Sequence, residues 1–229
     1  MVNIGLLAQK YDKFVIFDTE TTGLNFQRDE IIEFSAVVLE RRGDEVAVTR
    51  EYDNLVTLSP GNTVLPKITE LTGISTADIA ARGVAKKQVC ADIAEMFSGN
   101  TLLLAYNAHF DLSFLFYMLL RDGDPTVLKG KDKLDLLTVY KDRREYPHRL
   151  HNAIESYGLS GKVVNSHRAI DDVLATVAVM EAMAAEKDDL ECYVNLFGYN
   201  PKYGIDGKPI GSVTYKPQSF QLSLPLYLR

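Results

Sequence analysis

The sequence has only two cysteines in 229 residues, too few for a disulfide framework. Cys90 and Cys192 lie far apart without metal-ligand spacing, so reduced thiols in a cytoplasmic protein are the expectation. Long apolar runs are also missing. The longest, Leu112–Leu120, is interrupted by a serine and is far too short to cross a membrane. The first ten residues lack the basic start and apolar stretch of a secretory signal.

Positive charge is scarce as well. The net charge is −6 and the pI is near 5.3, so bulk electrostatics do not favour coating a nucleic acid. If the chain handles DNA or RNA, it should hold few phosphates at once or rely on a partner. The charge is uneven, because residues 193–229 carry four cations and one anion, which leaves −9 on residues 1–192.

The composition, 46% hydrophobic and 24% charged, is typical of a globular protein with a real core. β-branched and apolar runs predict strands, three of them before any helix. The expected strands are Phe14–Phe17, Ile31–Glu40 and Val46–Leu58, with a turn at Gly43-Asp44, and a later one at Thr101–Ala105.

Apolar residues at helical spacing follow the three strands, and the last helix carries them on one stripe. This order of elements predicts a mixed sheet flanked by helices. The expected helices are Lys67–Leu71 between Pro66 and Gly73, one through Val89, Ile93, Met96 and Phe97, Phe110–Leu120, and about Ala169 to Ala184. After Leu190 the periodicity stops, and Gly, Pro, Tyr and Asn become frequent.

The first motif is Asp18-Thr-Glu20-Thr-Thr-Gly, at the end of a buried strand. Residues two apart on a strand point to the same face, so the two carboxylates are directed at one point. Such charges repel, and their desolvation is costly unless they share a cation. A hard divalent metal bound through oxygens fits this pair. The alternative is a solvated strand end that carries two acids.

The second motif, Asn107-Ala-His-Phe-Asp111, lies where the strand at Thr101–Ala105 gives way to a helix. That position places polar groups at the end of the sheet. The alternative for Asp111 is a helix cap or a partner of the helix dipole.

The third motif is His167-Arg-Ala-Ile-Asp171-Asp172, at the start of the last helix. A histidine beside two acids at this position is a candidate for proton transfer near a metal. Helical geometry does not choose between the two acids, because they lie on opposite flanks of the apolar stripe.

Together the three motifs, from about Phe14 to Ala184, resemble the DnaQ-like 3′→5′ exonuclease superfamily, which includes the proofreading (epsilon) subunit of bacterial DNA polymerase III. The family places its histidine five residues before the aspartate, which selects Asp172 over Asp171. A tyrosine at position 168 would mark the sister subclass, and the arginine there indicates the DEDDh subclass. One departure is Tyr106, where many members carry histidine.

The resemblance implies an α/β, ribonuclease H-like fold with a mixed five-stranded sheet flanked by helices. It implies two ions, Mg²⁺ or Mn²⁺, held by Asp18, Glu20, Asp111 and Asp172, with Asp18 bridging. One metal would activate a water and the other would stabilise the leaving 3′ oxygen. His167 would take the proton of the water, which requires its neutral form. Thr21, Leu24, Asn107 and Phe110 would hold the terminal nucleotide, the apolar pair by packing against its base.

The implied activity is release of nucleoside monophosphates from unpaired 3′ ends of DNA in proofreading or repair. Fraying would supply selectivity for mismatched ends. Two alternatives remain open on the sequence: an exoribonuclease of the same superfamily that trims RNA, and a non-catalytic module that positions a polymerase or clamp.

The C-terminal Gln221-Leu222-Ser-Leu224-Pro-Leu226 resembles the peptide with which bacterial replication proteins dock on the sliding clamp. Leu224 and Leu226 would fill an apolar groove, while Gln221 would hydrogen-bond at its edge. The alternatives are an edge strand packed on the protein's own body, or a disordered end. We therefore expect an exonuclease domain over residues 1–190 and a tail of irregular structure or short strands over 191–229.

Overall fold

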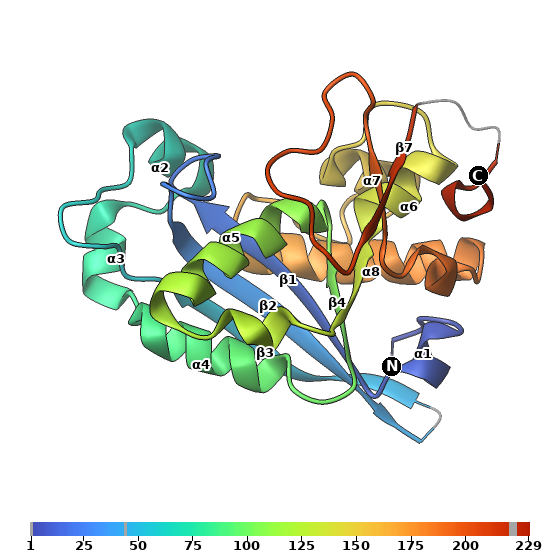
Figure 1. Cartoon of the computed structure of the whole chain (residues 1–229), viewed down its shortest axis with the longest axis horizontal. Coiled ribbons are helices and arrows are strands. Elements are labelled where there is room, and N and C mark those ends of the chain that lie inside the picture. The colour runs from blue at the N-terminus through green and yellow to red at the C-terminus, as the bar shows by residue number, and fades with distance from the viewer. Residues whose placement is uncertain (1, 44, 220–223) are drawn as a thin grey trace.

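A mixed five-stranded sheet forms the centre of the molecule (Figure 1). The computed structural model describes residues 2–43, 45–219 and 224–229. The first strand pairs antiparallel with the second, and the second with the third, whereas the last two strands run parallel to the first. In spatial order the strands are β3 (Glu45–Leu55), β2 (Ile31–Arg42), β1 (Lys13–Thr21), β4 (Thr101–Ala105) and β5 (Asp132–Asp135).

Strand β1 is buried on both faces, because its apolar residues fill two different cores. Phe14 and Ile16 pack with helix α8 on one face. Val15 and Phe17 pack with helices α4 and α5 on the other face. The central strand is therefore held between helical layers, as Figure 1 shows. Its carboxyl end is where the polar motif begins.

The helices occupy both faces of the sheet. Pro66 begins one of them and Gly73, in the left-handed region with φ 73°, ends it, as the sequence predicts. The α-helices are α1 (Leu7–Lys10), α2 (Pro66–Thr72), α3 (Thr76–Arg82), α4 (Lys86–Met96), α5 (Ala108–Asp122), α6 (Leu136–Arg143), α7 (Leu150–Ser156) and α8 (Ala169–Glu186). The 3₁₀ turns are η1 (Pro125–Leu128), η2 (Leu190–Tyr193) and η3 (Leu226–Leu228). Within the described ranges, no helix is both long and apolar enough to span a membrane.

The expected strands and helices are all present, with boundaries that differ by a few residues. Gly43 lies in the turn between β2 and β3, whereas Asp44 is outside the described residues. The α-helices and sheet strands that the sequence did not reveal are α1, α3, β5, α6 and α7.

The C-terminal segment forms two short parallel strands, β6 (Leu196–Tyr199) and β7 (Thr214–Pro217), and packs on the body of the protein. Tyr193 and Phe197 are buried in the two main cores. Leu226 is 0% exposed, and its backbone N–H donates to the Asp142 carboxylate. The segment is thus packed against the domain along much of its length.

This packing bears on the predicted clamp-docking peptide. Gln221 and Leu222 lie outside the described residues. Leu224 is 55% exposed, but Leu226 is in the protein's own core. Leu226 could fill a groove on a clamp only after leaving that core, so packing on the protein's own body describes this residue. Docking by the rest of the peptide stays a prediction.

Candidate active site

The first two acids of the candidate site stand at the carboxyl end of β1. Asp18 and Glu20 continue the alternation of Phe14 and Ile16, so both belong to the face that α8 covers. Both side chains are half-buried. The solvated strand end that the sequence left as an alternative does not describe them.

Helix α5 brings Asp111 to the same place from the opposite face of the sheet. Asp111 is 2% exposed, and its Oδ1 accepts hydrogen bonds from the Thr19 backbone N–H at 3.0 Å and the Thr19 hydroxyl at 2.7 Å. Thr19 lies between the two acids of β1, on the α5 side. Asp111 is therefore fixed to the central strand rather than serving only as a cap of its own helix.

The first turn of α5 is held by another acid, Asp135, which the sequence did not single out. Asn107 begins the helix in the left-handed region, with φ 73°. The backbone N–H groups of Asn107 and Ala108 donate to Asp135 Oδ1 at 2.9 and 3.0 Å. Asp135 also accepts the N–H groups of Leu137 and Thr138 at the start of α6. A single buried carboxylate thus positions the helix that carries Asp111.

Helix α8 contributes the remaining groups. Ligand atoms of Glu20, His167 and Asp172 lie within 4.8 Å of one another. Asp171 is not in this group, and its carboxylate accepts a hydrogen bond from the Ser166 hydroxyl instead. His167 has φ 57°, a conformation that costs a non-glycine residue on the order of 1 kcal/mol. The structure therefore places Asp172, the acid that the family spacing selects, beside Glu20 and His167.

Electrostatics at the site favour the protonated acids when no cation is bound. Burial, together with the charges of Asp111 and Glu20, raises the pKa of Asp18 well above its usual range. Burial raises the pKa of Glu20 to about 8, and Asp172 acts in the same direction. Burial raises the pKa of Asp111 to about 7 in spite of the hydrogen bonds from Thr19. Burial also raises the pKa of Asp172.

The donor set suits a hard divalent cation. The charge of Asp18 interacts with those of Asp111, Glu20 and Asp172, although among the described residues only Glu20, His167 and Asp172 have ligand atoms within 4.8 Å of one another. Within the described ranges none of the four carboxylates forms an ion pair with a lysine or arginine. Repulsion among buried carboxylates is relieved when they bind a metal through oxygen. The residues present therefore fit a site for divalent metal.

The comparisons with known proteins agree with this geometry. A family model described as Exonuclease matches residues 15–180, which contain the five predicted site residues. The chain belongs to this exonuclease family. The resemblance to DnaQ-like exonucleases is thereby confirmed.

Two curated relatives of this chain are named as DNA polymerase III proteins. The DNA polymerase III subunit epsilon of Treponema pallidum is 30% identical over 174 residues, which are 75% of this chain and 76% of that protein. The PolC-type DNA polymerase III of Clostridium perfringens is 33% identical over 203 residues, 87% of this chain. The chain spans only 13% of that PolC-type protein.

Among solved structures, E. coli exonuclease I in complex with a dA16 oligonucleotide superposes with a TM-score of 0.70. The match covers 80% of the present chain and 42% of the exonuclease I chain, at 22% identity. This likeness confirms the expected fold, a mixed five-stranded sheet flanked by helices.

The residues expected to hold a terminal nucleotide lie close to Glu20 and Asp111 along the chain. Leu24 is 79% exposed, so its side chain is free to contact a ligand. Phe110 is half-buried in the first turn of α5, one residue before Asp111. The Asn107 side chain is exposed. Thr21 is buried, and its hydroxyl donates to the Gly23 carbonyl at 2.6 Å, so it also shapes the turn that presents Leu24.

Sequence reasoning missed Glu33, which anchors the third motif. Glu33 is 0% exposed and lies opposite Glu20 on the neighbouring strand. Its carboxylate accepts from Arg168 Nε at 2.9 Å and from the Ala169 backbone N–H at 2.8 Å. It therefore caps α8 and fixes the residue next to His167. The signal was a single acid inside the apolar run of β2, a position that requires a partner.

We expect Glu33→Gln to lower the unfolding free energy of the exonuclease by about 1–3 kcal/mol, because the charged hydrogen bonds to Arg168 and Ala169 weaken. We also expect a lower kcat, since His167 and Asp172 flank these two residues. Denaturant unfolding and steady-state kinetics measure the two effects.

Glu40→Gln, on the same strand but outside this network, is the matched control and should change neither quantity. A double-mutant cycle with Arg168→Gln should show coupling between positions 33 and 168. Additive losses would mean that the pair does not position the site.

Proposed function

We propose that the chain removes nucleotides one at a time from the 3′ ends of DNA, in proofreading or repair. The observation that carries the proposal is the convergence of Asp18, Glu20, Asp111 and Asp172 with His167 at the end of β1. The epsilon-subunit relative supports it, because this chain covers most of that protein.

Two divalent cations, Mg²⁺ or Mn²⁺, would be held by the carboxylates of Asp18, Glu20, Asp111 and Asp172. When bound, such ions supply an activated water and stabilise charge on the attacking and leaving oxygens. The protein's contribution is to hold the carboxylates rigidly: Thr19 fixes Asp111, and Glu33 fixes the start of the helix that carries Asp172. Raised carboxylate pKa values mean that protons must leave as the cations enter.

His167 is exposed at the rim of the site, within reach of Glu20 and Asp172. We assign it the role of general base, which accepts a proton from the attacking water through a ring nitrogen. Leu24 and Phe110 would pack against the terminal base. A paired end has to fray before its base can reach them, which favours mismatched termini.

The partners belong to the same proposal. The net charge of −6 gives the chain little hold on DNA by itself, and its relatives are named as parts of DNA polymerase III. We propose that it acts in the cytoplasm beside a polymerase, with a sliding clamp as a further candidate partner. Such tethering raises the local concentration of 3′ ends.

The test is parallel digestion of 5′-labelled DNA and RNA of the same sequence with Mg²⁺, Mn²⁺ or EDTA. We expect a ladder that shortens from the 3′ end of DNA, faster for a mismatched end than for a paired one, and none with EDTA. Faster loss of RNA would reassign the substrate to RNA. No digestion with either metal would leave only the non-catalytic alternative.

A further inference from the structure

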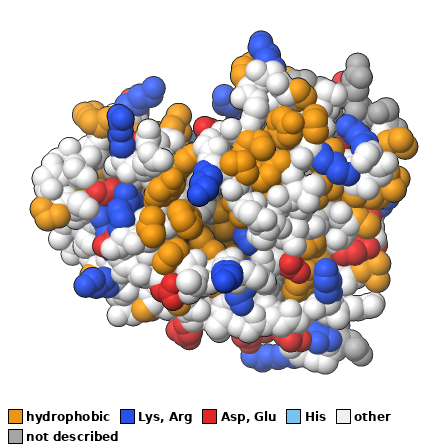
Figure 2. All heavy atoms as spheres, in the orientation of Figure 1, with side chains coloured by type: hydrophobic (Ala, Val, Ile, Leu, Met, Phe, Trp, Pro, Cys, Tyr) orange, Lys and Arg blue, Asp and Glu red, His pale blue; other side chains and the backbone are white. Residues whose placement is uncertain are grey.

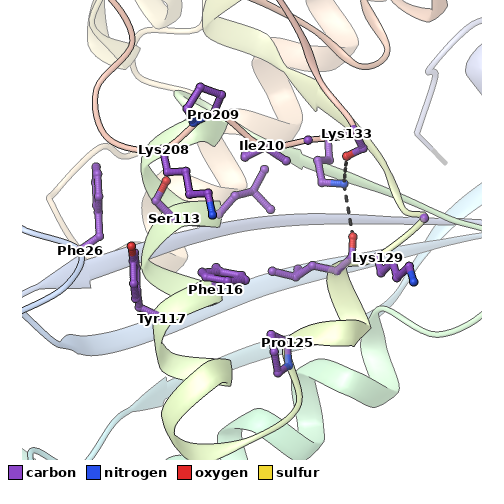
Figure 3. Close-up of a pocket in the computed structure, with 15 residues that line it drawn as sticks. Phe26, Ser113, Phe116, Tyr117, Pro125, Lys129, Lys133, Lys208, Pro209 and Ile210 are labelled. Carbon is purple, nitrogen blue, oxygen red and sulfur yellow. Dashed lines mark hydrogen bonds between the residues drawn. The ribbon is translucent and has the colours of Figure 1, made fainter.

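A cavity of about 490 Å³ lies outside the acidic site, between α5, η1 and the C-terminal segment 208–212. Figure 3 shows Lys208 reaching from the C-terminal segment towards α5, which carries Phe116 and Tyr117. The residues that define its character are three aromatics and three lysines: Phe26, Phe116, Tyr117, Lys129, Lys133 and Lys208.

The charge of this pocket is opposite to that of the whole chain. Three lysines line it and no acid does, although the net charge of the protein is −6. Lys133 is only 2% exposed, and its Nζ donates to the Lys131 carbonyl at 2.6 Å. It also donates to the Ser212 hydroxyl at 2.9 Å and the Leu128 carbonyl at 3.4 Å (Figure 3). These acceptors are uncharged. No carboxylate of the described residues forms an ion pair with Lys133.

Burial lowers the pKa of Lys133, and the charge of Asp132 acts in the opposite direction. Because its Nζ is buried and donates to three protein oxygens, Lys133 adds positive potential to the pocket rather than a hydrogen bond to a ligand. Lys129 and Lys208 are exposed at the rim of the pocket and are free to contact an anion there. The charge pattern therefore favours a ligand that carries phosphate or carboxylate groups.

The aromatic residues of the pocket narrow the choice of ligand further. Phe116 is 39% exposed and Tyr117 half-buried, so both offer ring surface to a ligand. Hydrophobic side chains gather over α5 and the adjoining C-terminal segment in Figure 2, with lysine or arginine beside them. Aromatic surface combined with cations is the chemistry that binds single-stranded nucleic acid without sequence preference.

The pocket adjoins the acidic site through two aromatic residues in contact. Phe26, in its wall, meets Phe110 edge-on with ring centroids 6.1 Å apart. Helix α5 runs away from the site, and Phe116 lies five residues beyond Asp111, about 7.5 Å along the axis at 1.5 Å per residue. Phe116 is also turned about 140° around the helix from Asp111, so a strand has to pass around α5 to reach it. Stacked nucleotides rise about 3.4 Å each, so the two residues are separated by at least about two nucleotides.

We propose that this pocket is a second nucleotide subsite, which holds the single strand about two to three positions upstream of its 3′ end. Bases pack on Phe116 and Tyr117, and a backbone phosphate approaches Lys208 and Lys129 at the rim. This inference rests on the proposed function, because it describes the path of the DNA strand upstream of the 3′ end that the acids hold. An acidic peptide of a partner protein would also pair with the lysines. A peptide would not need a pocket that adjoins Phe110, whereas a DNA strand held at Phe110 would.

The test compares a substrate that reaches only the acids with one long enough to reach the pocket. The full chain is assayed with Mn²⁺ on the p-nitrophenyl ester of thymidine 5′-monophosphate and on a 12-nucleotide oligothymidylate. We expect Phe116→Ala to raise KM for the oligonucleotide about tenfold, the effect of one lost base stack. We expect Lys208→Gln to raise it severalfold and to weaken its salt dependence. Hydrolysis of the ester and kcat on the oligonucleotide should stay unchanged.

Leu120→Ala and Lys202→Gln are matched controls, because both side chains are exposed nearby but do not line the cavity. An unchanged KM in Phe116→Ala and Lys208→Gln overturns the subsite, as does an equal rise in the controls. A parallel loss on the ester also overturns it, because the effect would then lie at the acids. If the parent cleaves neither substrate, the proposed function itself fails.

Discussion

Asp18→Asn is expected to lower the rate of 3′-end removal by at least about 10³-fold, with the protein still folded. The charges of Asp111, Glu20 and Asp172 act on the buried Asp18 carboxylate, so we place it at the centre of the proposed cation site. Losing several kcal/mol of metal-assisted stabilisation corresponds to this factor at 1.36 kcal/mol per tenfold. Single-turnover digestion of a labelled oligonucleotide measures it.

The same substitution should stabilise the metal-free protein at high pH. A carboxylate whose pKa is raised in the folded state binds its proton more tightly there, so the stability it contributes at low pH is lost as pH rises towards the folded value. The pKa of about 8 for Glu20 and of about 7 for Asp111 place this loss of stability between about pH 4 and pH 8. Removing one charge at position 18 relieves the repulsion, so the variant should exceed the parent in stability at pH 8 and approach it at pH 5.

Asp122→Asn, at the far end of α5, is the control and should leave both activity and pH dependence unchanged. Mn²⁺ should stabilise the parent against denaturant increasingly as pH rises, because the ligands must release protons. It should stabilise Asp18→Asn far less. Full activity in Asp18→Asn would contradict the assignment of the site.

A site residue could be predicted from the sequence when its position depends only on residues near it in the chain. Asp18 and Glu20 follow from the two-residue period of a strand, a rule that involves no distant residue. Asp111 required knowledge of what stands opposite α5, namely Thr19 on β1. Helical periodicity could not separate Asp171 from Asp172, and only the family spacing did so. Their hydrogen bonds explain the difference, since Asp171 turns to Ser166.

Long-range partners explain what the sequence did not reveal. Glu33 interacts with Arg168, which is 135 residues away, and nothing near Glu33 announces the pair. Strand β5 has the sequence Asp-Lys-Leu-Asp, without an apolar run, and becomes a strand because it pairs with β4. Leu226 looks like part of a free peptide but fills the protein's own core. In each case tertiary packing overrides the local pattern.

His167→Ala should lower kcat by about 10²–10⁴-fold, the usual contribution of a positioned general base, while Mn²⁺ affinity remains close to that of the parent. The residue stands in the left-handed region with φ 57°, where a strained backbone is maintained by the surrounding structure. Calorimetric titration with Mn²⁺ and steady-state kinetics on the thymidine ester measure the two quantities separately. Raising the pH should partly restore the rate, because hydroxide then replaces the water that needs a base.

The same experiment decides between two roles that the geometry allows. A ring nitrogen of His167 lies within 4.8 Å of ligand atoms on Glu20 and Asp172, close enough for direct coordination of a cation. If His167 were a ligand, its removal would weaken Mn²⁺ binding along with kcat, and high pH would restore little. His151→Ala, another exposed histidine, controls for loss of an imidazole elsewhere. Because His167 is at the rim of the site whereas Asp111 and Asp172 are buried within it, we expect the kinetic loss without the loss of metal.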